Sequence, residues 1–197
     1  MEKIEMDILA LANSETQPNS FVIILKEKYG NRRLPVVIGG FEAQAIALAL
    51  QDIKPNRPMT HDLFKESLVA LNVYLLEVLI SNLQEGVFYA TLVYLKPEGA
   101  NLEVDSRTSD ALALAVRFGC PIYANANVLE EAAIAVEEED EDEAIQATLR
   151  SSNNPDAPLS SISSIDLEKL LNDSLANEDY ERAAEIRDEL RTRKEKS

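Results

Sequence analysis

The chain has 197 residues, 46% of them hydrophobic and 27% charged, which is typical of a soluble globular protein with one domain and an appendage. Its single cysteine, Cys120, excludes a disulfide framework and a cysteine-cluster metal site, and we interpret this residue as a small core side chain rather than a nucleophile. The formal net charge is −16 and no part of the sequence resembles the basic stripe of a nonspecific nucleic-acid binder, so a few placed cations or metal ions would have to attract any polyanion.

The first segment, residues 2–11, is predicted to be a strand because Ile4, Met6 and Ile8 alternate with polar positions. Charges occur through the first seven positions, which excludes a secretory signal beginning there. No uninterrupted apolar run approaches the length of a membrane span. We therefore predict a cytoplasmic protein that does not enter a membrane.

The middle of the chain predicts two copies of one structural unit, each made of two strands joined by a turn and followed by an apolar helix. The two copies keep nearly the same spacing, since Ile38 to Ala45 and Val104 to Ala111 are both 7 residues. The helix at 40–50 is apolar nearly all round, so we expect it to be buried on most sides. The predicted elements are strands from 21 and at 34–38 with a helix at 43–50, and strands at 88–95 and 101–104 with a helix at 109–116.

Between the copies, Thr60 is placed to cap a helix at 62–71, and a strand follows at 73–83. After the second copy, Gly119 suits a helix C-cap, followed by a last short strand at 121–123 and a helix at 128–136. Groups of strands between helices predict an α+β domain over residues 1–136, with a duplicated strand-strand-helix unit and a largely antiparallel sheet.

A linker is predicted at residues 137–161. It contains seven consecutive acids, Glu137 to Glu143, and a stretch rich in serine and proline. Residues 131–160 carry nine acids and one base, a net charge of −8, which is half of the charge excess of the chain. A solvated tether is the plainer interpretation, and an acidic interaction tail is the other.

Residues 162–197 predict a helical hairpin. Leucines from Leu167 to Leu175 recur at helical spacing, and a second apolar stripe runs from Tyr180 to Leu190. Each helix has about 12–15 residues, a length that is marginal in isolation. We therefore expect the hairpin to dock on a partner, which is another copy, another protein or the main domain.

Two polar stretches are candidates for chemistry. His61 is the only imidazole, suited to proton transfer or metal ligation, although it can simply lie at the start of a helix. The turn 104–110 holds more polar groups than capping by Thr108 or Ser109 requires. Its arginine can form an ion pair, or it can bind phosphate while the neighbouring acids hold a metal. In the first copy, Glu42 occupies the matching turn, where compensation of the helix dipole alone can explain it.

Four motifs, in order, resemble those of the bifunctional nuclease family, and the resemblance covers about residues 1–135. The C-terminal stretch, 167–190, is similar to the UVR motif, a helical hairpin that mediates protein contacts in excision-repair subunits and some Clp-protease partners. Thr108 and Ser106 depart from the residues common in the family. The four motifs are 34–43, 57–63, 86–90 and 104–114.

The resemblance implies a nuclease that acts on RNA, DNA or both. The leading hypothesis adds assistance by Mg²⁺ or Mn²⁺, no organic cofactor, and catalysis by His61, Asp62, Asp105 and Arg107 of the polar stretches. Substrate binding is expected from Arg57, Thr60 and Ser109, and metal ligation from Glu42, Asp62, Asp105 and Asp110.

The alternative is a non-catalytic regulatory protein whose polar loops form an assembly surface and whose hairpin recruits a repair or Clp-type partner. The acidic total charge and the hairpin favour it. Both interpretations predict a protein partner bound through residues 162–197 and a homo-oligomer, because apolar helices and a self-complementary hairpin promote association.

Overall fold

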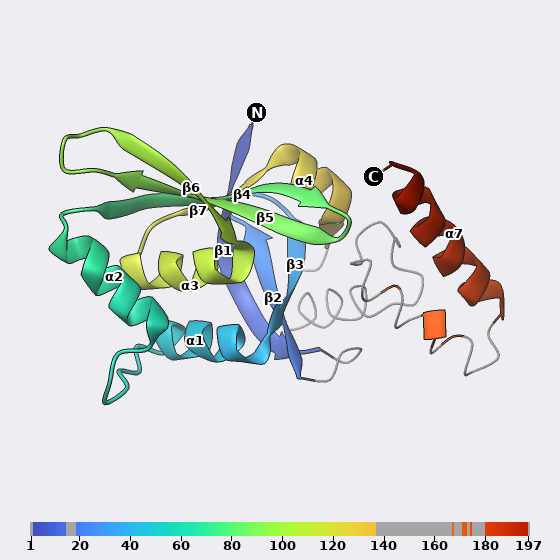
Figure 1. Ribbon diagram of the computed structural model, residues 1–197, viewed down its shortest axis with the longest axis horizontal. Coiled ribbons are helices and arrows are strands. Elements are labelled where there is room, and N and C mark those ends of the chain that lie inside the picture. The colour runs from blue at the N-terminus through green and yellow to red at the C-terminus, as the bar shows by residue number, and fades with distance from the viewer. Residues whose placement is uncertain are drawn as a thin grey trace. The chain divides into compact units, whose positions relative to one another are not determined.

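The computed structural model describes residues 2–14, 19–136, 167, 171, 172, 174 and 180–196. These residues form two units (Figure 1). The main unit contains the described residues up to 82 and from 88 to 136, and the second unit contains 83–87 and those from 167 onward. The predicted linker, 137–161, lies outside the described residues, and the predicted domain boundaries stay predictions.

Eight strands form one sheet in the order β6-β5-β4-β7-β1-β2-β3-β8. β4 pairs with β7 in parallel, whereas β1 with β2 and β7, β2 with β3, β3 with β8 and β5 with β6 are antiparallel. This architecture confirms the predicted α+β class with a largely antiparallel sheet. The strands are β1 (Lys3–Asn13), β2 (Ser20–Glu27), β3 (Arg32–Gly39), β4 (Tyr74–Gln84), β5 (Val87–Leu95), β6 (Asn101–Arg107), β7 (Ile122–Asn125) and β8 (Ile134–Ala135).

The duplication is confirmed, and each copy is one strand larger than predicted. Each copy consists of three strands followed by a helix. The first copy is β1, β2, β3 and helix α1 (Gly40–Leu50), and the second is β4, β5, β6 and helix α3 (Thr108–Phe118). The two strand triplets are mirrored in the sheet on either side of β7. Helices α1 and α3 lie side by side (Figure 1), so that the polar turns at their starts are brought together.

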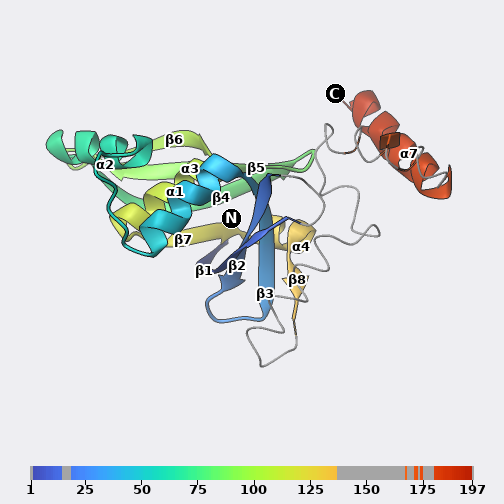
Figure 2. The ribbon, with the colours of Figure 1, turned by 90° about the horizontal axis from the view of Figure 1, so that it is seen from below.

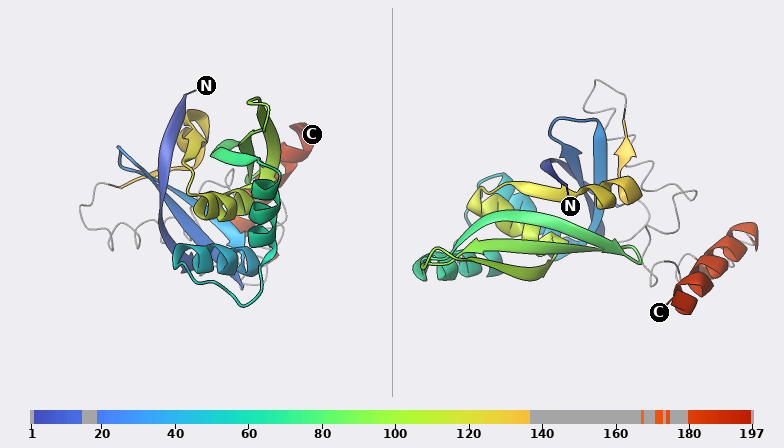
Figure 3. Two further views of the ribbon diagram at one scale, coloured as in Figure 1. Left: turned by 90° about the vertical axis from the view of Figure 1, so that its left-hand side faces the viewer. Right: turned by 90° about the horizontal axis from the view of Figure 1, so that it is seen from above.

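The sheet is strongly twisted, as expected for many strands of right-handed twist. Figure 2 shows β1 to β3 running steeply across the direction of β4 to β6. The helices α1, α2 (Thr60–Ala70) and α3 lie together beside the strands, as the left view of Figure 3 shows. Fully buried side chains such as Ile23, Ile46 and Leu112 fill the core between sheet and helices.

Helix α1 is less buried than its composition suggests. Only Ala43, Ala45 and Ile46 are buried, whereas Phe41 is 87% exposed. The expectation that this helix is buried on most sides is therefore wrong. One side of α1 packs on α3 and the sheet, and among residues 2–14 and 19–136 no second layer covers the other side.

Two of the predicted helix caps are wrong. Thr60 is the first residue of α2, and the residue before the helix is Met59, whose backbone N–H donates to Asp62 Oδ2 at 2.9 Å. Thr108 is likewise inside α3, and its hydroxyl donates to the Phe88 carbonyl of β5 at 3.1 Å. The predicted C-cap is confirmed, because Gly119 has the left-handed φ of 66° that glycine adopts without strain.

The segment after α3 also differs from its prediction. Helix α4 spans Ala126–Ala132, and the chain then forms β8 instead of continuing as a helix to residue 136. Pairing of Ile134 and Ala135 with β3 replaces the last helical turn. Cys120 is half-buried against the core, where burial raises the pKa of its thiol to about 11, in agreement with a structural role.

The second unit contains helix α7 (Tyr180–Lys196), which is longer than expected. Leu167, Ile186 and Leu190 are buried in one small cluster, and Leu171 packs against it. These contacts confirm the apolar stripes at those positions. The remaining leucines of the first predicted stripe lie outside the described residues.

Candidate functional site

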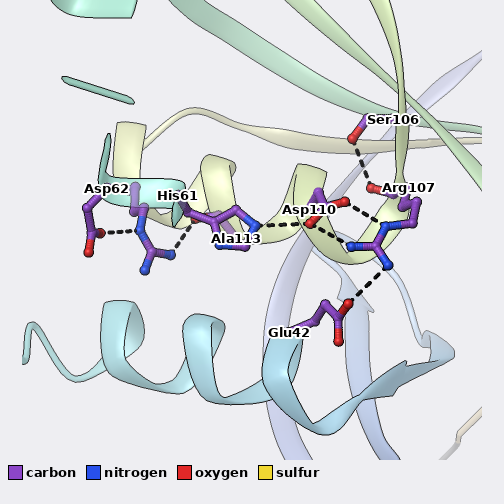
Figure 4. A network of polar contacts seen from close by, with 8 residues as sticks. Glu42, His61, Asp62, Ser106, Arg107, Asp110 and Ala113 are labelled. Carbon is purple, nitrogen blue, oxygen red and sulfur yellow. Dashed lines mark hydrogen bonds and ion pairs between the residues drawn. The ribbon is translucent and has the colours of Figure 1, made fainter. Parts of the chain in front are cut away.

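A polar network joins three helices where β6 ends and α3 begins (Figure 4). Arg107, the last residue of β6, donates from Nε to Asp110 Oδ2 at 2.7 Å and from Nη2 to Asp110 Oδ1 at 3.2 Å. Its Nη1 lies 3.0 Å from Glu42 Oε1 in the first turn of α1. His61 of α2 completes the network, with Nε2 lying 3.0 Å from Asp110 Oδ1. The network thus connects residues up to 68 positions apart, from 42 to 110.

The network holds Asp110 ionised. Burial raises the pKa of this carboxyl, but the hydrogen bonds from Arg107 and His61 lower it more, so that the resulting pKa lies below the ordinary value. The same contacts raise the pKa of Arg107, with the bond to Asp110 as the largest cause. Asp110 is therefore a hydrogen-bond acceptor at neutral pH and cannot itself act as a general acid there.

An ionised Asp110 determines which nitrogen of His61 carries a proton. A carboxylate only accepts hydrogen bonds, so Nε2 of His61 must be the donor in their contact. In the neutral ring this leaves Nδ1 as the proton acceptor. The His61 side chain is 16% exposed, which keeps the ring in one environment while leaving part of it open to solvent.

A second network fixes α2 on α3. Arg117, whose side chain is only 7% exposed, donates from Nε to Asp62 Oδ1 at 2.6 Å and from Nη1 to the Ala113 carbonyl at 3.0 Å. Lys65 of α2 donates to the backbone carbonyl of Arg117. The other oxygen of Asp62 accepts the Met59 N–H at the start of α2. Both oxygens of Asp62 are thus occupied by contacts that position the helix.

The predicted site residues fall into two groups. Glu42, His61, Arg107 and Asp110 meet in one network, and Asp62 lies beside them in the second network. The remaining four take no part in the contacts of either network. Asp105 is exposed on β6 opposite Thr91, Arg57 is exposed between α1 and α2, Thr60 is exposed at the start of α2, and Ser109 is half-buried in α3.

The four predicted metal ligands do not form a cation site. Among residues 2–14, 19–136 and the described part of the second unit, no group of three or more His, Cys, Asp or Glu side chains is placed to hold a metal ion. Glu42 and Asp110 are paired with Arg107, and Asp62 is paired with Arg117. A metal would have to displace a guanidinium, so this donor set does not fit Mg²⁺ or Mn²⁺. The use of either metal stays a prediction.

The lowered pKa values of Asp110 and Asp62 predict acid sensitivity. Burial raises the pKa of Asp62, but the bonds from Arg117 and Met59 lower it more. Both carboxyls therefore bind fewer protons in the folded than in the unfolded chain. The stabilisation is complete above the unfolded pKa of 3.8 and is lost as pH falls through the lower folded values. We expect the free energy of unfolding to fall steeply below about pH 4, measured by urea unfolding monitored by circular dichroism.

The variant Asp110→Asn should make this fall shallower. Glu98→Gln is the matched control, because the pKa of Glu98 is also lowered, by a hydrogen bond from Lys96, but the pair is exposed and screened by solvent. An Asp110→Asn profile as steep as that of the parent chain would show that the network does not contribute to the acid sensitivity.

Arg117 and Lys65 are the site residues that sequence reasoning missed. Arg117 follows a run of alanines, leucines and a valine in α3, and a charged side chain within an apolar helix is a signal that it has a buried partner. No local pattern identifies that partner, because Asp62 lies 55 residues earlier.

Comparison with known proteins gives two family matches. The model of the bifunctional nuclease domain matches residues 23–137, which is more than half of the chain, and that of the UvrB/uvrC motif matches residues 165–195. Both matches confirm the resemblances found in the sequence. Two similar relatives are uncharacterised proteins of Mycobacterium tuberculosis, one from strain CDC 1551 / Oshkosh and one from strain ATCC 25618 / H37Rv. Each is 44% identical over 133 residues, which cover 68% of this chain and 79% of the relative.

No helix in the described part of the chain has both the length and the apolar content needed to cross a membrane. The cytoplasmic location stays a prediction.

Proposed function

The chain belongs to the bifunctional nuclease domain family, and from this premise we propose that its main unit hydrolyses phosphodiester bonds of RNA, DNA or both. The observation that carries the proposal is the pairing of the only imidazole of the chain with an ionised carboxylate beside an exposed guanidinium. An imidazole oriented by a carboxylate is a common device for proton transfer, and a guanidinium suits the binding of a phosphate.

His61 is proposed as the general base. Asp110 holds the ring through Nε2 and stabilises the positive charge that develops when the ring takes a proton. The acceptor in the neutral ring is Nδ1, which is the atom proposed to take the proton from an attacking water. Proton transfer by a positioned side chain contributes about 10²- to 10⁴-fold to a rate.

Arg107 is proposed to bind a phosphate group of the nucleic-acid substrate. A guanidinium has five N–H donors, and the contacts with Asp110 and Glu42 use three of them. The side chain is 67% exposed, so its remaining donors are accessible to a ligand. Glu42 and Asp110 hold the planar group from two helices and reduce the entropy that phosphate binding would otherwise cost.

The other predicted roles remain part of the proposal. Arg57, Thr60 and Ser109 are proposed to bind substrate because they lie in the segments that flank the network, at 51–60 and at the start of α3. A catalytic role of Asp105 rests on the family resemblance. The described carboxylates do not form a metal site, so no step is assigned to Mg²⁺ or Mn²⁺ here.

The variant Arg107→Lys tests whether Arg107 binds the phosphate. Lysine keeps the charge but loses the planar fork, so we expect kcat/KM for RNA or DNA cleavage to fall about tenfold or more. The assay follows cleavage of end-labelled RNA and DNA, with Mn²⁺ and separately with a chelator. Arg187→Lys is the matched control, since Arg187 is 68% exposed and contacts the carboxylate of neighbouring Asp188.

Equal effects of the two lysine substitutions would remove Arg107 from the site. Cleavage that continues in the chelator at the rate seen with Mn²⁺ would contradict the prediction that a divalent metal assists. No cleavage by the purified parent chain under either condition would leave the non-catalytic alternative.

The second unit supports binding of a protein partner, and we propose this as the function of residues 162–197. The UvrB/uvrC motif match covers almost all of this segment. The described cluster of Leu167, Ile186 and Leu190 is small, which is consistent with a hairpin completed by a partner. The non-catalytic alternative, recruitment of a repair or Clp-type partner, shares this feature and is also favoured by the net charge of −16. The homo-oligomer stays a prediction.

A further inference from the structure

Helix α2 packs on the main unit through a mostly polar side. His61, Asp62 and Lys65 hold it on α3, Leu68 packs against the core, and none of its residues is buried. Three large apolar side chains next to one another face solvent instead, namely Leu63, Phe64 and Leu71, which are 58%, 46% and 66% exposed. A surface helix normally buries its apolar side chains, so this outward stripe is the feature that needs a partner.

We propose that the stripe formed by Leu63, Phe64, Ser67 and Leu71 is the interface between two copies of this chain, paired through antiparallel α2 helices. The stripe is self-complementary, because Leu63 and Leu71 lie four residues before and four residues after Ser67. An antiparallel partner that crosses at Ser67 places each Leu63 against Leu71 of the second copy. Such a two-fold arrangement repeats every contact.

Ser67 is suited to the centre of this interface. Its side chain is small, which allows two helices to approach closely at the crossing point. Its hydroxyl donates to the Leu63 carbonyl of the same helix at 2.8 Å. Burial of Ser67 in a dimer therefore leaves no unpaired donor, and the polar residue within the apolar stripe does not oppose association.

The charge around the stripe favours a second copy over an acidic or basic partner. The chain has a net charge of −16, and the half of it that lies outside residues 131–160 still opposes association with another copy. Residues 51–71 are neutral in total, with three acids and three bases, so repulsion is least there. The acids are Asp52, Asp62 and Glu66, and the bases are Lys54, Arg57 and Lys65.

The exposed apolar area indicates a weak dimer. With roughly 200 Å² for a fully exposed large side chain, Leu63, Phe64 and Leu71 offer about 340 Å² per copy. Two copies would bury about 680 Å² from these three side chains. This area is smaller than that of stable specific interfaces, so we expect a weak dimer that depends on concentration.

The right-hand view of Figure 3 places α2 at one end of the strands β4 to β6, where a second copy can approach it. Because α2 also carries His61 on its inner side, dimerisation would hold that residue against α3. This consequence rests on the proposed function, whereas the dimer itself does not.

Sedimentation velocity of the full chain, from about 1 to about 100 μM, tests the proposal. The parent chain is expected to shift from monomer to dimer over this range. The double variant Leu63→Gln/Leu71→Gln should weaken the dimer at least tenfold, because each substitution occurs twice in the interface. Leu102→Gln is the matched control on β6, with a leucine 43% exposed in the parent chain, and should leave the dimer unchanged.

Cross-linking supplies a second, independent measurement. Ser67→Cys should form a disulfide-linked dimer on mild oxidation, because the two Ser67 positions meet at the two-fold axis. The parent chain should not, since Cys120 is half-buried and its pKa is raised to about 11. Leu102→Cys controls for random collision. A monomer at about 100 μM, a dimer insensitive to the double variant, or Ser67→Cys cross-linking no faster than Leu102→Cys would each overturn the proposal. If the double variant does not fold, the cross-linking result decides.

Discussion

Replacement of His61 by glutamine is expected to lower kcat for RNA or DNA cleavage by about 10²- to 10⁴-fold. Glutamine keeps a planar polar group that can donate a hydrogen bond to Asp110, but it cannot take up a proton at neutral pH. The chain contains no other histidine, so no second imidazole can replace the missing base. Initial rates on end-labelled RNA and DNA measure the loss.

Two controls make this result specific. His61→Gly in the presence of added imidazole should recover part of the activity, because the free base can occupy the space of the missing side chain and act as the proton acceptor. Urea unfolding of His61→Gln should show a midpoint close to that of the parent chain. Unchanged cleavage by His61→Gln, in preparations shown to be free of other nucleases, would exclude this site.

Replacement of Arg117 by alanine is expected to lower the free energy of unfolding by about 1–3 kcal/mol, the usual cost of leaving a buried polar partner unsatisfied. Arg117 is nearly buried and bonds both Asp62 and the Ala113 carbonyl. The value lies below that for a fully buried ion pair because the Asp62 side chain is 26% exposed and recovers some solvation. The loss is measured as a lower urea midpoint at unchanged slope.

Arg187→Ala is the matched control for Arg117→Ala. Arg187 also pairs with an aspartate, Asp188, but both side chains are more than 60% exposed, so the change should stay within about 0.5 kcal/mol. Arg117→Ala should also reduce nuclease activity, since the Asp62 contact holds the helix that carries His61. An unfolding midpoint equal to that of the parent chain would contradict the anchoring role of Arg117.

The parts of the fold that follow local rules were accessible from the sequence. The equal spacing of the two copies, the left-handed Gly119 and the pairing of Arg107 with Asp110 three residues later all depend on residues that are near one another in the chain. The first strand of each copy was recognised as a strand but not as part of the repeat. Its membership becomes visible only when β1 and β4 are seen in mirrored positions of the sheet.

The remaining contacts join residues that are far apart in the sequence, and no local pattern predicts such pairs. His61 and Asp110 are 49 residues apart, and each alone is explained equally well by its place near the start of a helix. The predicted cap at Thr108 failed for a related reason, because a threonine near a helix start has a hydroxyl that can donate to a distant strand. Thr108 illustrates this, since its partner is the Phe88 carbonyl of β5.

The position of β7 has a consequence for synthesis of the chain on the ribosome. This strand follows both copies in the sequence, yet it lies between them, bonded to Lys3–Met6 of β1 on one side and to Val78–Ile80 of β4 on the other. Until residue 125 has emerged, β1 and β4 each have an unpaired edge, and such edges can recruit strands of other chains. Neither half of the duplication is therefore a self-sufficient folding unit, and a truncated product that ends before Ile122 is a substrate for aggregation or degradation.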